Sequence, residues 1–126
     1  MQQPRRRILI LDDSDICREM AQMELEEHGY DVTGLDGPGG FADALRQSEP
    51  DLALVDVSMP GLDGRQLVEI ARGAEPHRCV IVLFSDRSEG ELQGLVRSWG
   101  AAGFIRKSGK EGELVRQVEQ FLGGPW

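Results

Sequence analysis

The sequence predicts an α/β fold in which one five-stranded parallel sheet is covered by five helices. Short runs of continuous apolar residues alternate along the chain with amphipathic segments of helical periodicity. The apolar runs lack the alternation of a half-exposed strand, as expected of strands buried on both faces of a parallel sheet. At 126 residues, with 40% hydrophobic and 29% charged residues, the chain suits a single globular domain.

The first predicted strand covers residues 7–11 and ends at Asp12 and Asp13. Asp13 or Ser14 can cap the helix that follows. That helix carries an apolar stripe, with margins at Ile16 and Met23, which consists of Cys17, Met20, Ala21 and Leu25. Residues 30–35 predict a second, weaker strand. Its partial alternation of apolar and polar residues places it near an edge of the sheet.

The third predicted strand is the centre of the chain. After a loop at 36–40 and a short helix, residues 52–55 run without a polar residue into Asp56, and Pro60 and Gly61 end the segment. Asp56 is therefore expected at the carboxyl end of a central strand, the edge of open α/β sheets where ligands bind. Our hypothesis is that Asp56 is a nucleophile that accepts a phosphoryl group.

A helix and a fourth strand follow. The pair Asp63 and Gln66 resembles a capping box for a helix that ends at Gly73 and Pro76. Residues 79–84 form another continuous apolar run, which predicts the fourth strand and stops at Ser85.

The last three elements continue the alternation. Ser88 and Glu91 form a second capping box, before an amphipathic helix whose stripe consists of Leu92, Leu95, Val96 and Trp99. Residues 103–105 predict a short fifth strand that leads to Lys107. Ser108 and Glu111 offer one more capping box, which predicts that the last helix begins there.

Composition excludes several classes of function. The net charge of −8 disfavours direct binding of nucleic acid, because an acidic domain repels phosphates. The longest apolar runs are far shorter than the ~20 residues that span a membrane, and the N-terminal run is too short for a signal peptide. A cytoplasmic location is therefore expected. Cys17 and Cys79 are expected to be buried, reduced thiols, and the basic run 5–7 a solvated strand entry.

Polar groups follow four of the five predicted strands. They are Asp12 and Asp13, Asp56, Ser85 and Lys107. Because the carboxyl ends of parallel strands meet at one edge, these side chains are expected to lie together. The strand order 2-1-3-4-5 would place the first, third and fourth strands side by side, although the pattern alone does not fix that order.

The charges of this group point to a cation. Three neighbouring carboxylates repel one another, and one Mg²⁺ together with the Lys107 ammonium would balance them. Oxygen ligands without His or Cys favour a hard ion such as Mg²⁺, which leaves room for a phosphoryl oxygen. A carboxylate is a competent nucleophile in phosphoryl transfer, which depends on positioning and charge neutralisation. The Ser85 hydroxyl can donate a hydrogen bond to the phosphoryl group.

These landmarks resemble a known family. Asp12-Asp13, Leu54-Val55-Asp56 with Met59-Pro60-Gly61-Leu62-Asp63-Gly64, Phe84-Ser85 and Phe104-Ile105-Arg106-Lys107 are similar to the receiver domain of two-component response regulators, as in single-domain chemotaxis regulators. The resemblance covers residues 7–122, and it leaves 1–6 as a basic extension and 123–126 as a tail. It implies a flavodoxin-like sheet of order 2-1-3-4-5.

The resemblance also implies a site and its partners. Asp56 would be phosphorylated by a histidine kinase or phosphotransfer protein. Asp13, Asp56 and the backbone carbonyl of Ser58 would coordinate Mg²⁺, with Asp12 helping through water. Ser85 and Phe104 would form the switch. Output to a downstream protein would pass through the face of the fourth helix, fifth strand and fifth helix, with a phosphorylation-dependent dimer as one form of output and no membrane or nucleic-acid contact. Such a domain is not an enzyme in the usual sense, although it catalyses its own phosphotransfer and dephosphorylation.

Three residues depart from the family pattern. Asp86 follows Ser85, where the family usually has a small residue, and its charge and bulk could slow phosphorylation by small donors or alter partner choice. Ser108 follows Lys107, where the family usually has Pro, so we expect a trans bond or a reshaped loop. Phe104 lacks the hydroxyl of the Tyr that is common at its position.

Two other functions fit parts of the sequence. Asp13-Ser14-Asp15 faintly resembles the D-x-D motif of haloacid-dehalogenase-type phosphatases, in which Asp13 would be the nucleophile and Asp56 would have no role. A pseudo-receiver, an interaction module that is never phosphorylated, is favoured only by Asp86. Such modules usually lack an acidic or Lys landmark, whereas this chain keeps them all.

Overall fold

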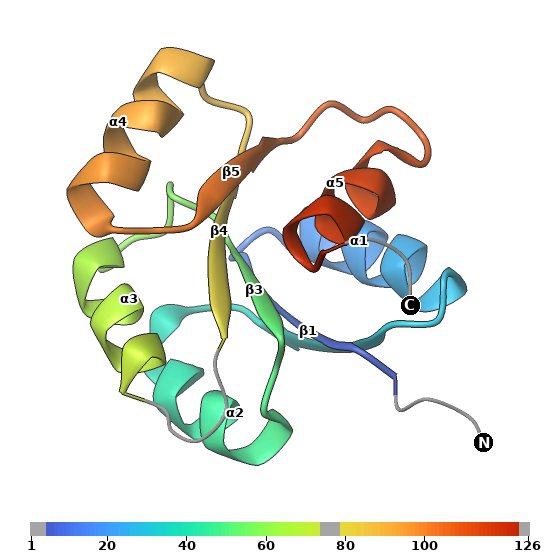
Figure 1. Ribbon diagram of the computed structural model, residues 1–126, viewed down its shortest axis with the longest axis horizontal. Helices are drawn as coiled ribbons and strands as arrows, with labels where there is room; N and C mark the ends of the chain where they lie inside the picture. Colours follow the sequence, from blue (N-terminus) through green and yellow to red (C-terminus); the bar gives the residue numbers. More distant parts are fainter. Residues whose placement is uncertain (1–4, 74–78, 124–126) are drawn as a thin grey trace.

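The computed structural model describes residues 5–73 and 79–123. It contains one parallel sheet in the order β2-β1-β3-β4-β5 (Figure 1), so the predicted fold class and strand order are confirmed. Pro76, residues 1–4 of the predicted basic extension and residues 124–126 of the predicted tail lie outside the described residues. The elements are β1 (Arg7–Leu11), α1 (Asp15–Glu27), β2 (Asp31–Leu35), the 3₁₀ turn η1 (Pro38–Gly40), α2 (Phe41–Ser48), β3 (Leu52–Val55), α3 (Gly64–Arg72), β4 (Val80–Ser85), α4 (Glu89–Trp99), β5 (Gly103–Arg106) and α5 (Glu113–Phe121).

The sheet is covered on both faces. Helices α1 and α5 lie on one face, and α2, α3 and α4 on the other (Figure 1). Successive residues of β1 therefore belong to opposite cores: Ile8 and Ile10 join the cluster under α1 and α5, whereas Leu9 and Leu11 join the cluster under α2 and α3. This explains the continuous apolar runs of the central strands, because all of β3, residues 8–11 of β1 and residues 81–85 of β4 are buried.

Three of the predicted helix starts are confirmed by their caps. Ser14, Asp63 and Ser88 each accept a hydrogen bond from the backbone N–H three residues later. The predicted start of the last helix at Ser108 is wrong. Helix α5 begins after Gly112, whose φ of 80° is readily available only to glycine, and it has no side-chain cap.

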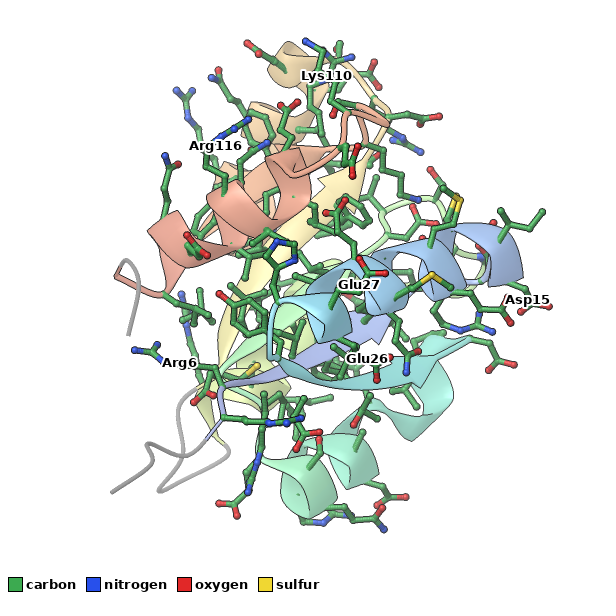
Figure 2. All side chains as sticks on the ribbon, turned by 90° about the vertical axis from the view of Figure 1, so that its right-hand side faces the viewer. Arg6, Asp15, Glu26, Glu27, Lys110 and Arg116 are labelled. Atoms are coloured by element: carbon green, nitrogen blue, oxygen red, sulfur yellow. The ribbon has the colours of Figure 1, made fainter. Side chains whose placement is uncertain are left out.

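The predicted apolar stripe of α1 is only partly buried. Ala21 and Leu25 enter the core, whereas Met20 is 67% exposed, so its assignment to the buried stripe is wrong. The margin residues Ile16 and Met23 are also exposed. In the described part of the chain, α1 packs mainly against β1, β2 and α5. Figure 2 shows this side of the molecule, with the acids Asp15, Glu26 and Glu27 on α1 and basic Arg116 on α5.

The two cysteines are free, as predicted, but only partly buried rather than buried. Burial raises the pKa of the Cys79 thiol to about 12, which keeps it in the unreactive protonated form. Within the described ranges, the structure contains no helix with both the length and the apolar character to cross a bilayer.

The carboxyl half of α4 is attached to α3. The Arg65 guanidinium donates to the carbonyl oxygen of Ser98 at 3.0 Å, and Arg72 donates to that of Gly100 at 3.2 Å. Gly64 permits a still closer approach, because a Cβ atom there would lie 2.0 Å from the Trp99 ring. Trp99 is thus a packing residue, partly buried against two core clusters.

Candidate functional site

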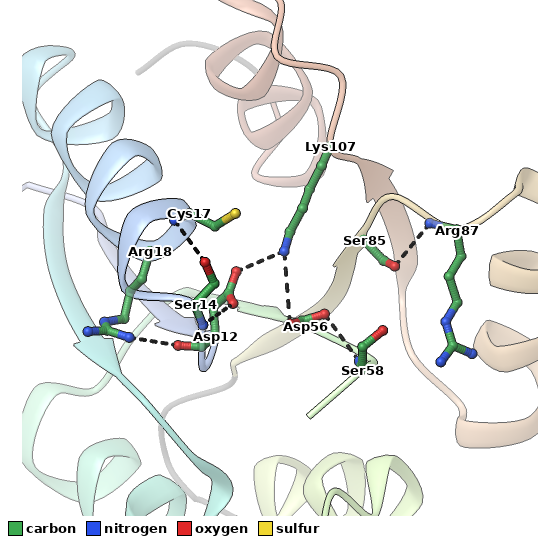
Figure 3. Close-up of polar contacts among 9 residues, drawn as sticks. All are labelled: Asp12, Ser14, Cys17, Arg18, Asp56, Ser58, Ser85, Arg87 and Lys107. Atoms are coloured by element: carbon green, nitrogen blue, oxygen red, sulfur yellow. Dashed lines mark hydrogen bonds and ion pairs between the residues drawn. The ribbon is translucent and has the colours of Figure 1, made fainter. Parts of the chain in front are cut away.

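The predicted site residues lie at the carboxyl edge of the sheet because the register of the strands aligns them. Leu11 is beside Val55, and Val55 is beside Leu83, so β1 and β3 end at the same level and β4 continues two residues further, to Ser85. Backbone hydrogen bonds continue past the strand ends, from Asp56 N to Leu11 O and from Lys107 N to Ser85 O, both 2.8 Å. The loops that carry the polar side chains are therefore fixed to the sheet (Figure 3).

Asp56 is a buried carboxylate at the end of β3. Its side chain accepts a hydrogen bond from the Ser58 N–H at 3.1 Å, and its other oxygen lies 3.9 Å from the Lys107 amine. Burial raises the pKa of Asp56 above its usual value, and the charge of Asp12 adds to the effect. The Ser58 N–H and Lys107 act in the opposite direction without cancelling it. Asp56 therefore favours an additional positive charge beside it.

Asp12 and Lys107 form the closest ion pair of the site. The Lys107 Nζ donates to Asp12 Oδ2 at 2.9 Å, and Asp12 Oδ1 accepts the Ser14 N–H at 2.9 Å. Burial alone would lower the pKa of Lys107, but the hydrogen bond to Asp12 and the charges of Asp12 and Asp56 raise it above its usual value. The amine also lies 5.3 Å from the centre of the Phe84 ring, a cation–π distance. Lys107 is held as a cation that points at the acids.

The three carboxylates could hold a metal ion. Oxygen atoms of Asp12, Asp13 and Asp56 all lie within 4.8 Å of one another. After pairing with one lysine, the group keeps an excess of negative charge that a divalent cation would balance. A donor set of carboxylates alone fits a hard cation such as Mg²⁺ and argues against Zn²⁺ or copper. Asp12 and Asp56 are buried, whereas Asp13 is exposed and open to solvent.

Ser85 is fully buried at the end of β4, next to β5. Its Oγ accepts the Arg87 N–H at 3.1 Å, which leaves the hydroxyl proton free to be donated. Asp86, one residue on, is exposed. Phe104 lies one strand further away, on β5, half-buried against the cluster of Leu83 and Leu92. The structure thus brings the three acids and Lys107 together, with Ser85 on the adjacent strand and Phe104 outside this group.

Two residues near the site were not expected to belong to it. Phe84 was predicted as part of a buried strand and, with Ser85, as a family landmark, but it was given no role in the site; its ring lies under the Lys107 amine. Arg18 donates from Nη1 to the backbone carbonyl of Asp12 at 2.8 Å. The spacing of Asp15 and Arg18 on a helix indicates their ion pair, but no pattern in the sequence reveals a side chain that reaches back to a strand-end carbonyl.

The fold and the acidic edge are those of a signalling domain of receiver type. The family model for the response regulator receiver domain matches residues 8–119. The chain therefore belongs to the response regulator receiver domain family of two-component systems.

Similar proteins agree with this assignment. The transcriptional regulatory protein CseB of Streptomyces avermitilis is 33% identical over 116 residues, which cover 91% of this chain and 48% of CseB. Protein PilH of Pseudomonas aeruginosa is 29% identical, with 94% of this chain and 98% of PilH covered. The chain thus spans about half the length of CseB. The solved structure of chemotaxis protein CheY4 of Vibrio cholerae shares the fold, with a TM-score of 0.82 at 20% identity over 93% of this chain and 98% of CheY4.

Proposed function

We propose that this receiver domain accepts a phosphoryl group on Asp56 from a histidine kinase or phosphotransfer protein, with Mg²⁺ as cofactor, and signals through contacts with a downstream protein. The observation that supports this most strongly is the environment of Asp56. It is a buried carboxylate whose oxygen lies 3.9 Å from the Lys107 amine and within 4.8 Å of oxygens of two further acids.

Each residue of the site would have a defined role in the phosphoryl transfer. An Asp56 carboxylate oxygen forms a bond to phosphorus while the bond from phosphorus to the donor's imidazole nitrogen breaks, and the electron pair leaves with that nitrogen. Asp56 has to be ionised to attack, which its raised pKa opposes in the absence of a further cation. Mg²⁺, when bound, supplies charge neutralisation of the transferred group. Asp13, Asp56 and the Ser58 carbonyl are its proposed ligands, with Asp12 contributing through water.

Lys107 and Ser85 would respond to the new phosphoryl group. The Lys107 amine is shared between Asp12 and Asp56 and can move to a phosphoryl oxygen. The Ser85 hydroxyl can donate its proton to another oxygen of the group. Movement of the Ser85 side chain toward the phosphoryl group would strain the loop after β4. This loop is connected to β5 by a 3.0 Å hydrogen bond from Arg106 Nε to the Arg87 carbonyl. Phe104 and the surface of α4, β5 and α5 would carry this change to a partner or a second copy of the domain.

The same site would return the domain to its resting state, because water that reaches the phosphorylated Asp56 can hydrolyse it.

We propose residues 7–122 as the limits of the domain. Arg6 donates to the carbonyl of Leu122 at 3.1 Å, so the entry to β1 and the end of α5 meet. Residues 1–6 and 123–126 are then an extension and a tail, and a cytoplasmic location fits the phosphodonors proposed.

Intact-protein mass spectrometry after exposure to acetyl phosphate tests the proposal. With Mg²⁺, the wild type is expected to gain one acid-labile phosphoryl group, whereas Asp56→Asn gains none because its amide is not a nucleophile. Asp43→Asn, which removes an exposed carboxylate of α2, is the matched control and is expected to behave as the wild type. Labelling of Asp56→Asn would contradict the proposal.

A further inference from the structure

The side chain of Arg18 is largely buried, although it belongs to the first turn of the surface helix α1. Its side chain is 16% exposed, whereas its ion-pair partner Asp15 is 76% exposed. The guanidinium donates from two nitrogens. Nη2 donates to Asp15 at 2.6 Å, and Nη1 donates to the Asp12 carbonyl at 2.8 Å (Figure 3). The first turn of α1 is thereby joined to the end of β1 by a contact that spans the loop between them.

Strand β2 provides the space for this contact. A Cβ atom on Gly34 would lie 3.1 Å from Arg18 Cδ and 3.4 Å from Cγ, so a larger residue would displace the arginine stem. The absence of a side chain at position 34 lets Arg18 lie flat against the edge strand. The position of the guanidinium is thus set by α1 and β2 together.

The loop that Arg18 closes carries two of the three acids of the candidate metal site, Asp12 and Asp13. Asp12 is held independently, because its carboxylate oxygens contact Lys107 and the Ser14 N–H. Asp56 is held by the Ser58 N–H. Asp13 is exposed, and in the described part of the chain its carboxylate makes no hydrogen bond or ion pair. The position of Asp13 therefore depends on the backbone of the loop.

We propose that Arg18 is a positioning residue for the cation site: by bonding to the Asp12 carbonyl it fixes the β1–α1 loop and so places Asp13 for a divalent cation. The inference rests on the proposed Mg²⁺ site. It is separate from the electrostatic influence of Arg18, because a positive charge near the acids weakens cation binding. Removal of the positive charge alone would strengthen Mg²⁺ binding, whereas loss of the contact with the Asp12 carbonyl would weaken it.

Titration with MgCl₂ at constant ionic strength, followed by amide chemical shifts in NMR spectra, separates these effects. Arg18→Gln and Arg18→Lys are both expected to weaken Mg²⁺ binding about tenfold, the lower end for residues that orient metal ligands. Lysine keeps the charge but cannot bridge Asp12 and Asp15 with two nitrogens. Gly34→Val is expected to weaken binding similarly, and adding it to Arg18→Gln is expected to cause little further loss.

Arg46→Gln is the matched control. Arg46 pairs with Asp43 at the same helical spacing, but both side chains are 69% exposed, and among the described residues neither has a hydrogen bond to a strand end. Its Mg²⁺ affinity is expected to equal that of the wild type. A second measurement is the rate of phosphorylation by acetyl phosphate: at saturating Mg²⁺ the Arg18 variants are expected to reach the wild-type rate, with only the half-saturating Mg²⁺ concentration raised.

Several results would overturn the inference. If Arg18→Gln binds Mg²⁺ as tightly as the wild type or more tightly, Arg18 does not position the cation site. Unchanged affinity in Gly34→Val would contradict the role of its side-chain position, and this variant decides the matter if the Arg18 variants do not fold. A wild type that does not bind Mg²⁺ would overturn the proposed function as well, whereas a wild type that binds while all variants match it would overturn this inference alone.

Discussion

At the scale of single residues, Asp56 combines burial with a charge that its surroundings only partly compensate. Burial raises the pKa of Asp56 in the folded state. Its contribution to stability is therefore fully present below the pKa of an unfolded aspartate and is lost as the pH rises through the folded-state pKa. In the absence of a divalent cation, the ionised carboxylate costs the domain stability at neutral pH.

Asp56→Asn is accordingly expected to be more stable than the wild type at neutral pH without Mg²⁺, with a melting temperature higher by about a few degrees. The difference is expected to disappear at a pH below the range in which an ordinary aspartate ionises, where the wild-type carboxyl is neutral in both states. Thermal denaturation across this pH range provides the measurement. A lower melting temperature of Asp56→Asn at neutral pH would contradict this account of Asp56.

Lys107 is the cation on which the buried Asp12 depends. The Asp12 side chain is 1% exposed, and removal of its partner leaves a buried charge without a counterion. Lys107→Ala is expected to lose about 3 kcal/mol of unfolding free energy, the cost of breaking a buried pair, measured by urea denaturation. It is expected to bind Mg²⁺ still, and the ion is expected to restore part of the stability. Coupling between phosphorylation and partner affinity is expected to be lost.

Lys110→Ala is the control for this variant, because Lys110 is exposed on the same loop and forms no ion pair within the described ranges. It is expected to unfold at the wild-type urea concentration. A Lys107→Ala protein as stable as this control, or one whose partner affinity still responds to phosphorylation, would contradict the role given to Lys107.

The positions of the site residues could be predicted only for residues that lie at the ends of strands. Asp12, Asp13 and Asp56 directly follow strands and Ser85 ends one, so parallel pairing places them at one edge. The contacts of Arg18 and Phe84 with the site residues could not be predicted. One depends on the space above Gly34 and the other on the path of the Lys107 side chain, and both are set by tertiary packing.

At the scale of elements, the contact between α3 and α4 makes a prediction about two glycines. Gly64→Ala is expected to destabilise the domain by about 1–3 kcal/mol, because the added Cβ overlaps the Trp99 ring. Gly94→Ala, in the middle of α4 with nothing within 4 Å of its Cβ position, is expected to stabilise it by up to about 1 kcal/mol. Denaturant unfolding of both variants measures the two effects. Equal stabilities would show that Trp99 is not fixed against Gly64.

The elements also show which features of a helix are local. Ser14, Asp63 and Ser88 cap their helices through contacts that span three residues, so the sequence suffices to predict them. Ser108 instead donates to the Glu113 carboxylate, and α5 starts later, at the turn that Gly112 allows. The exposure of Met20 was equally unpredictable, because the width of a buried stripe depends on the neighbours of α1.

At the scale of the whole molecule, the alternation of strand and helix was enough to predict the class of fold. The strand order required the resemblance to receiver domains, since hydrophobic patterning does not specify which strands are neighbours. The resulting order places β1, β3 and β4 together at the centre of the sheet. A chain with a net charge of −8 thereby gathers three of its acids at one rim beside a single lysine.

We propose that Asp56 accepts a phosphoryl group at this rim. The most direct test is to treat the wild type with acetyl phosphate and Mg²⁺, reduce the acyl phosphate with borohydride, and map the modified residue by peptide mass spectrometry. Modification is expected at Asp56 alone, and it is expected to be absent when a chelator removes Mg²⁺. Modification at Asp13, as in a haloacid-dehalogenase-type phosphatase, or no modification of a domain that binds Mg²⁺, would contradict this proposal.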